Sequence, residues 1–252
     1  PPLKWSHPIP DTYRESGHFP RNREEMGWHP WVRVPVNRDF RDIRLVKSRI
    51  LPILDIPYSP EAYRRIQLGG LGPEAYRGYL EGFFRESGAR VAYGGYMENR
   101  SLYAAYAHFG TTGQAARTLH LGLDLWAPEG TSVRAPKAGR VHSWGNHKSA
   151  GDYGPVILME HETAGGPIHT LYGHLSPDDL RGLRPGRRVR AGEIIGHLGG
   201  ESDNGGYWPH LHFQVIHDLQ GYSGDYPGVT DAGNRAFFER NCPDPALFLG
   251  LP

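Results

Sequence analysis

The sequence His120-Leu121-Gly122-Leu123-Asp124 opens the part of the chain that decides the fold. From about Leu119 onward, short β-like runs follow one another, and each is bounded by Gly or Pro. Several of these runs alternate in character, as half-buried antiparallel strands do. We therefore predict a mainly β, antiparallel domain over residues 101–252. Its expected strands are residues 131–135, 140–144, 156–161, 169–174, 189–198 and 211–217.

The residues before this domain have a different character. The first 50 are rich in Pro, Arg, Trp and His. Within them, residues 31–36 show a brief alternation of apolar and other residues that suggests a strand. Two short helices are expected further on. Ser59-Pro60-Glu61 offers an N-cap, a first-turn proline and an acid, and Gly72-Pro73-Glu74 opens a helix that Gly88 ends. We therefore predict an N-terminal α/β extension over residues 1–100.

The charge balance and the lack of a long apolar run argue against nucleic acid and membrane as partners. The 252 residues contain 28 Lys and Arg against 27 Asp and Glu, so the basic surplus typical of a nucleic-acid-binding protein is missing. No stretch approaches the roughly 18 apolar residues of a membrane helix. The first residues lack the apolar central run of a signal peptide, which favours a cytoplasmic over a secreted location. The sequence leaves the oligomeric state undetermined.

A second histidine pair completes a candidate metal site. In an extended chain, residues two or four positions apart face the same way, so His120 can converge with Asp124, and His210 with His212. Spacing alone is not decisive, because the chain has 14 histidines and also contains the pairs His7/Asp11 and His174/Asp178. Two histidines and one carboxylate from two strands would leave one coordination position open. Catalytic zinc keeps such a position for water, whereas structural zinc usually has four protein ligands.

The order of the surrounding motifs makes this prediction specific. Over residues 119–217 the chain resembles the lysostaphin-type (LytM-like) zinc metallopeptidases. The resemblance implies an antiparallel LytM-type β-sheet domain with a Zn²⁺ cofactor, in which His120, Asp124 and His212 are the metal ligands. It also implies that His174 and His210 are the catalytic histidines. The blocks that carry it are His120–Asp124, Ala127-Pro128-Glu129-Gly130-Thr131, Leu171-Tyr172-Gly173-His174-Leu175, Gly192-Glu193-Ile194-Ile195-Gly196 and Pro209-His210-Leu211-His212-Phe213.

The function implied by the resemblance is hydrolysis of an amide or peptide bond through a metal-activated water. The substrate would be peptidoglycan or another peptide. Histidine suits the transfer of a proton to the leaving amine, because its unperturbed pKa is about 6.5. Which of His174 and His210 is the general base stays open.

Several positions depart from the family pattern. Peptidoglycan-cutting members usually have the sequence Ser-Thr-Gly-Pro before the His-x-His motif, whereas residues 204–209 of this chain are Asn-Gly-Gly-Tyr-Trp-Pro. Those members also have Glu after the Phe that follows the motif, whereas this chain has Gln214. Segments 94–100, 224–229 and 242–245 resemble a peptidase-like module that is fused in bacteria to kinase-like and class III aminotransferase domains. This narrower likeness predicts an alternative function: a zinc enzyme of the same fold that acts on a small metabolite in a biosynthetic pathway, by hydrolysis or by another reaction. It also brings Glu98, Asn99 and Arg100 toward the cleft.

Two further classes are disfavoured. A metal-free binding module on this fold would have lost ligands, but all five histidine and aspartate positions are present. A non-haem iron oxygenase also uses two histidines and a carboxylate. Its usual pattern places the acid two residues after the first histidine, whereas His120 and Asp124 are four apart.

Overall fold

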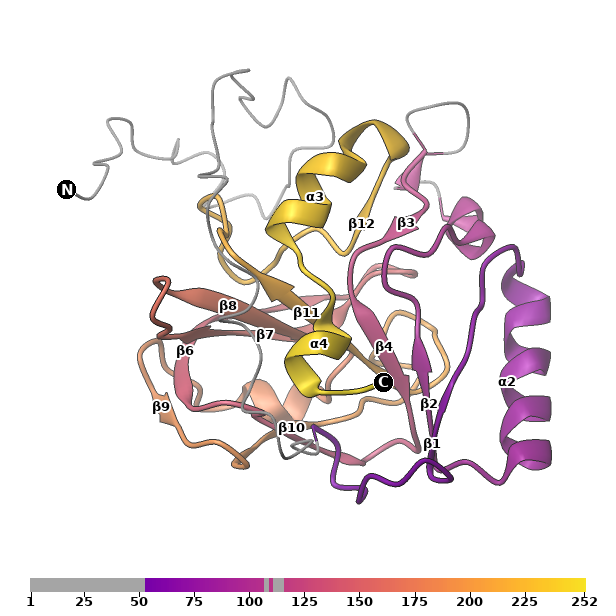
Figure 1. Ribbon diagram of the computed structural model, residues 1–252, viewed down its shortest axis with the longest axis horizontal. Helices are drawn as coiled ribbons and strands as arrows, with labels where there is room; N and C mark the ends of the chain where they lie inside the picture. Colours follow the sequence, from indigo (N-terminus) through magenta and orange to yellow (C-terminus); the bar gives the residue numbers. More distant parts are fainter. Residues whose placement is uncertain (1–52, 107–108, 111–115) are drawn as a thin grey trace. The chain divides into compact units, whose positions relative to one another are not determined.

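The computed structural model describes residues 53–106, 109–110 and 116–252. The strand expected at 31–36 and the pair His7/Asp11 lie outside these residues. The strands are β1 (Tyr63–Arg65), β2 (Val91–Gly94), β3 (Leu119–His120), β4 (Leu123–Trp126), β5 (Ser132–Arg134), β6 (Gly139–His147), β7 (Gly154–His161), β8 (Ile168–Gly173), β9 (Arg188–Val189), β10 (Ile194–His197), β11 (His210–Ile216) and β12 (Val229–Thr230). The helices are α2 (Pro73–Ser87), α3 (Arg235–Asn241) and α4 (Pro245–Leu249), with 3-10 turns η2 (Ser101–Ala105), η5 (Pro177–Leu180) and η6 (Ala232–Asn234) (Figure 1).

One large sheet organises these elements. Its strands follow the order β1-β2-β4-β11-β8-β7-β6-β9, and two small two-stranded sheets, β10-β5 and β12-β3, accompany it. Every pair in the large sheet is antiparallel except β1–β2. A strand occupies each of the six predicted strand regions. The prediction of a mainly β, antiparallel fold is therefore confirmed.

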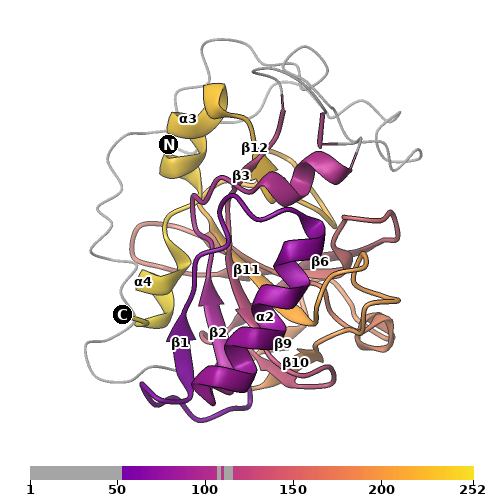
Figure 2. The same cartoon turned by 90° about the vertical axis from the view of Figure 1, so that its right-hand side faces the viewer.

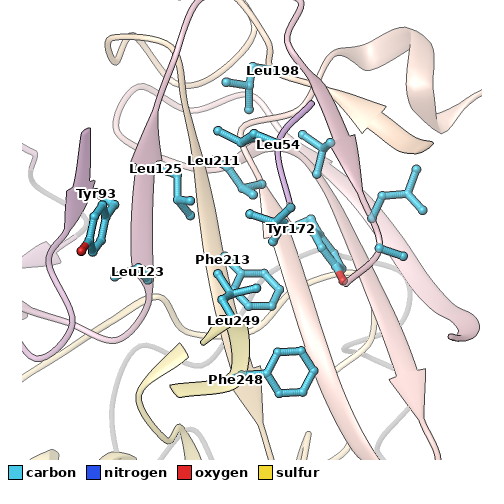
Figure 3. Packing of buried hydrophobic residues seen from close by; sticks show 14 of the residues in the cluster. Leu54, Tyr93, Leu123, Leu125, Tyr172, Leu198, Leu211, Phe213, Phe248 and Leu249 are labelled. Carbon is cyan, nitrogen blue, oxygen red and sulfur yellow. The ribbon is translucent and has the colours of Figure 1, made fainter. Parts of the chain in front are cut away.

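Around β4 and β11, one face of the sheet carries apolar side chains and the other carries polar ones. Leu123 and Leu125 of β4 and Leu211 and Phe213 of β11 point into the main hydrophobic core, where α4 also packs (Figure 3). Burying side chains of this size contributes about 1.5–3 kcal/mol each. Because successive residues of a strand face opposite sides, the polar residues between these apolar ones lie on the other face. The core therefore fixes the register that brings polar side chains of β4 and β11 together.

Helix α2 follows the sequence signals at both of its ends. Pro73 occupies its first turn after the N-cap Gly72, and Gly88 ends it with φ 64°, a left-handed conformation that glycine adopts without steric cost. The helix lies beside β1 and β2 in both views (Figures 1 and 2). Its residues Tyr76 and Leu80 are buried against this side of the sheet, whereas Tyr79 is 39% exposed. The aromatic residues of α2 are thus only partly buried.

The prediction of a helix starting at Ser59 is wrong. Ser59 Oγ accepts the N–H of Ala62 at 3.1 Å, but this capping bond closes a single turn, after which the chain enters β1. Tyr63 is 5% exposed and pairs with Val91 of β2, so burial and strand pairing outweigh the local capping preference. Strands β1 and β2 join the same sheet as β4. The division of the chain at residue 100 stays a prediction.

Among the described residues, no helix is long and apolar enough to cross a membrane.

Candidate metal centre

Strand pairing brings the predicted metal ligands together. His212 of β11 lies directly opposite Asp124 of β4, and His120 ends β3 four residues before that carboxylate. One ligand atom from each of the three side chains lies within 4.8 Å of the other two. Each of these residues is at most 3% exposed. Among the residues that the structure describes, this is the one cluster of His, Cys, Asp or Glu that meets this spacing.

The spacing fits a tetrahedral ion. Asp124 Oδ1 lies 3.2 Å from His120 Nε2 and 3.2 Å from His212 Nδ1, and the two nitrogens are 2.9 Å apart. Zinc ligands at about 2.0–2.1 Å in tetrahedral geometry would be roughly 3.3 Å apart. The three ligand atoms therefore already stand close to the positions that a zinc ion requires.

The outer nitrogens of both histidines are engaged by carbonyl oxygens. His120 Nδ1 donates to Gly95 O at 2.9 Å, and His212 Nε2 donates to Gln214 Oε1 at 3.0 Å. The Gln214 amide orientation follows from its other contact, because its Nε2 donates to Pro227 O at 3.2 Å. These bonds leave a lone pair on each inner nitrogen. Three acceptor atoms then face one another in a buried space, an arrangement that a cation stabilises.

The carboxylate of Asp124 has two different environments. Its Oδ2 accepts a hydrogen bond from Arg100 Nη1 at 2.6 Å, whereas its Oδ1 is buried, has no hydrogen-bond partner among the described residues, and faces the two histidines. Burial opposes the charge on Asp124, but His120 and Arg100 hold its pKa well below the usual range. Burial and the Arg100 charge lower the pKa of His120 to about 4. The neutral imidazole and the charged carboxylate are the forms that bind a metal ion.

The two remaining predicted residues lie beside this cluster. His174 Nδ1 donates to Asn204 O at 2.8 Å, and His210 Nδ1 donates to Trp208 O at 2.7 Å, so each ring keeps Nε2 as its acceptor. The two rings have centroids 4.2 Å apart, and His210 Nε2 lies 3.9 Å from Asp124 Oδ1. Burial lowers the pKa of both imidazoles, which keeps them neutral and able to accept a proton. Their catalytic role stays a prediction.

Three tyrosines enclose the histidines, and sequence reasoning did not single them out. Tyr103 stacks on His120, Tyr153 packs against His212, and Tyr207 contacts both His174 and His210. No spacing rule connects Tyr103 or Tyr153 with the histidine motifs, since the tertiary fold alone brings them together. Tyr207 belongs to the 204–209 segment that departs from the family pattern. The site therefore has an aromatic, largely desolvated wall.

Gly122 leaves room for one of the predicted ligands, and this gives a testable prediction. A Cβ at this position would lie 2.5 Å from His212 Cε1 and Nε2, so Gly122→Ala must displace that imidazole. We expect zinc affinity to fall at least about tenfold, as measured by competition with a chromophoric chelator, because ligand placement sets metal affinity. Gly78→Ala is the matched control, since no atom of the described residues lies within 4 Å of its added Cβ. Equal affinity of the Gly122→Ala variant and the wild type would contradict the ligand assignment of His212.

The chain thus forms a mainly antiparallel β fold with a buried His-Asp-His cluster that could hold a metal ion. Residues 118–223 match the model of peptidase family M23. The family resemblance predicted from the motifs at 119–217 is thereby confirmed. The likeness to the module with kinase-like and aminotransferase partners stays a prediction.

Curated relatives also match part of the chain. The DD-carboxypeptidase/endopeptidase Mpg of Neisseria meningitidis serogroup B is 39% identical over 98 residues, which are 38% of this chain and 20% of that protein. The protein of the same name from Neisseria gonorrhoeae gives the same values. The chain thus spans about a fifth of the length of these relatives.

Solved structures show a weaker overall likeness. The catalytic domain of lysostaphin from Staphylococcus simulans is 29% identical, with 48% of this chain and 80% of that chain covered and a TM-score of 0.34. A zinc-containing peptidase from Vibrio cholerae is 30% identical, with 39% of this chain and 27% of that chain covered and a TM-score of 0.31.

Proposed function

We propose that this protein is a zinc-dependent metallohydrolase that cleaves an amide or peptide bond, with His120, Asp124 and His212 as the zinc ligands. The observation that carries the proposal is the buried triangle of three acceptor atoms at 2.9–3.2 Å, including the unpartnered Asp124 Oδ1. The M23 domain supports the reaction class, since its relatives are named as peptidases.

The remaining residues suit such a reaction. A zinc ion held by these ligands would polarise the scissile carbonyl and acidify water. His174 and His210 each have Nδ1–H tied to a backbone carbonyl, so Nε2 can accept a proton and return it to the leaving nitrogen. The aromatic wall excludes bulk water, which strengthens the electrostatic interactions inside the site.

The proposed substrate is a peptide, and the peptide cross-links of peptidoglycan are the first candidates because of the names of the relatives. We expect about one zinc per purified chain by elemental analysis. We also expect zinc-dependent clearing of a cell-wall suspension, with new amino groups in the soluble products. A chain that binds no zinc at micromolar concentrations would overturn the metal assignment, and unchanged walls would remove peptidoglycan as the substrate.

Two features favour a second candidate, hydrolysis of an amide in a small metabolite. The five histidine and aspartate side chains of the site are each at most 5% exposed, which suits a small enclosed substrate better than a polymer strand. In addition, Gln214, which departs from the pattern expected of peptidoglycan-cutting members, contacts His212 directly. A panel of short N-acyl amino acids and dipeptides distinguishes the two candidates. Zinc-dependent cleavage of such amides with no effect on walls would select the small-molecule function.

A further inference from the structure

We infer that Arg100 is a positioning residue for the metal-ligating carboxylate, and that it reaches the site from outside the M23-matched segment. The inference rests on the proposed zinc site but not on the identity of the substrate. Arg100 is 2% exposed, and its guanidinium lies 5.7 Å from the ring centroid of Trp126. It precedes residues 118–223, so the family match does not contain it.

The guanidinium decides which oxygen of Asp124 is available to a metal ion. Its Nη1 donates to Asp124 Oδ2 at 2.6 Å, and this short charge-assisted bond leaves Oδ1 facing His120 and His212. With Oδ2 occupied, the carboxylate can offer the ion a single oxygen. Arg100 therefore favours one-oxygen coordination and a fixed carboxylate plane.

Arg100 is itself held in place by a second carboxylate. Its Nε donates to Glu98 Oε2 at 2.9 Å, and Glu98 Oε1 accepts the backbone N–H groups of Leu68 and Gly69 at 2.6 and 2.9 Å. Tyr103 Oη accepts from Nη1 at 3.3 Å. The planar fork of a guanidinium can bond both carboxylates at once, whereas a lysine ammonium is a single point charge. This chain of bonds anchors Asp124 to the backbone around residues 68–69.

The same segment also orients a second metal ligand. Gly95 O accepts the Nδ1–H of His120, and Gly95 has φ 99°, a conformation that side chains rarely adopt. A Cβ on Gly95 would lie 2.0 Å from Arg100 Nη2 and 3.1 Å from His120 Nδ1. The segment from Gly95 to Arg100 therefore supports two of the three ligands. Removing partners of this kind typically weakens metal binding 10- to 100-fold.

Metal affinity tests this inference directly. We expect Arg100→Gln to lower zinc affinity about 10- to 100-fold in chelator competition, and Arg100→Lys to restore part of the loss, because lysine keeps the charge but not the fork. The cobalt(II)-substituted protein should change its visible absorption in both variants, since the carboxylate is freed to bind through two oxygens. Arg77→Gln is the matched control: it breaks the exposed Arg77–Glu201 ion pair and should leave affinity and spectrum unchanged.

A further variant covers the case in which Arg100→Gln does not fold. Glu98→Gln keeps the Arg100–Asp124 pair but weakens its anchor, and we expect it to fold and to bind zinc several-fold more weakly. Wild-type affinity in Arg100→Lys and Glu98→Gln, or in a folded Arg100→Gln protein, would overturn the inference. A wild-type chain that binds zinc but hydrolyses nothing would instead refute the proposed function and leave the role of Arg100 intact.

Discussion

Replacing Asp124 by alanine is expected to abolish stoichiometric zinc binding and hydrolysis together. The variant loses the only carboxylate in the candidate ligand set and the oxygen that stands 3.2 Å from both histidine nitrogens. It also leaves the buried guanidinium of Arg100 without this partner, and breaking a buried ion pair on one side costs about 3–5 kcal/mol. Elemental analysis, an activity assay and denaturant unfolding measure the three effects.

The chain contains a matched control for this prediction. Asp178 stands four residues after His174, the same spacing that separates Asp124 from His120, but its side chain is 70% exposed and pairs with Arg181 at the surface. Asp178→Ala should keep zinc, activity and stability near the wild-type values, because exposed pairs contribute about 0–1 kcal/mol. Full zinc occupancy in the Asp124→Ala variant would refute the ligand assignment.

Replacing either histidine of the proposed proton-handling pair should give the opposite combination, with zinc retained and turnover lost. His210→Ala is expected to lower kcat by about 10²–10⁴, the usual contribution of general acid–base catalysis, while one zinc per chain remains. For His174 the better variant is asparagine. His174 adopts φ 64°, and asparagine tolerates this left-handed conformation better than alanine does.

The measurement is zinc content beside steady-state kinetics on the same preparations. His142→Ala is a suitable control, since His142 is half-buried and its Nδ1 bonds to the neighbouring Ser143 and not to the candidate site. Full activity in either the His174 or the His210 variant would remove that residue from proton transfer. Loss of zinc in either variant would make it part of the ligand set.

The convergence of Asp124 and His212 was predictable because it depends on a period that the sequence displays. Leu123, Leu125, Leu211 and Phe213 alternate with polar residues, and each must face the core. That requirement turns Asp124 and His212 to the opposite face, where antiparallel pairing sets them side by side. Motif order then distinguished His120/Asp124 from the His-x3-Asp spacings elsewhere.

Other features depend on contacts that no local pattern records. The signals at Ser59 are those of a helix start, yet Tyr63 gains more from pairing with β2 and from burial than from continuing a helical turn. Similarly, the bond from Arg100 to Asp124 joins residues 24 positions apart through the tertiary fold. Only the narrower family likeness pointed to Arg100, and nothing in the sequence pointed to Tyr153.

The position of β4 within the large sheet has a consequence for protein engineering. This strand lies between β2 and β11, but β2 precedes the M23-matched segment. A fragment trimmed to residues 118–223 would turn β4 into an edge strand with unpaired amide and carbonyl groups. It would also uncover Trp126, which is fully buried against Ala92 and Tyr76. Exposed strands of this kind pair with copies of themselves, so the trimmed fragment would aggregate. A fragment designed for expression or fusion should therefore begin upstream of β1.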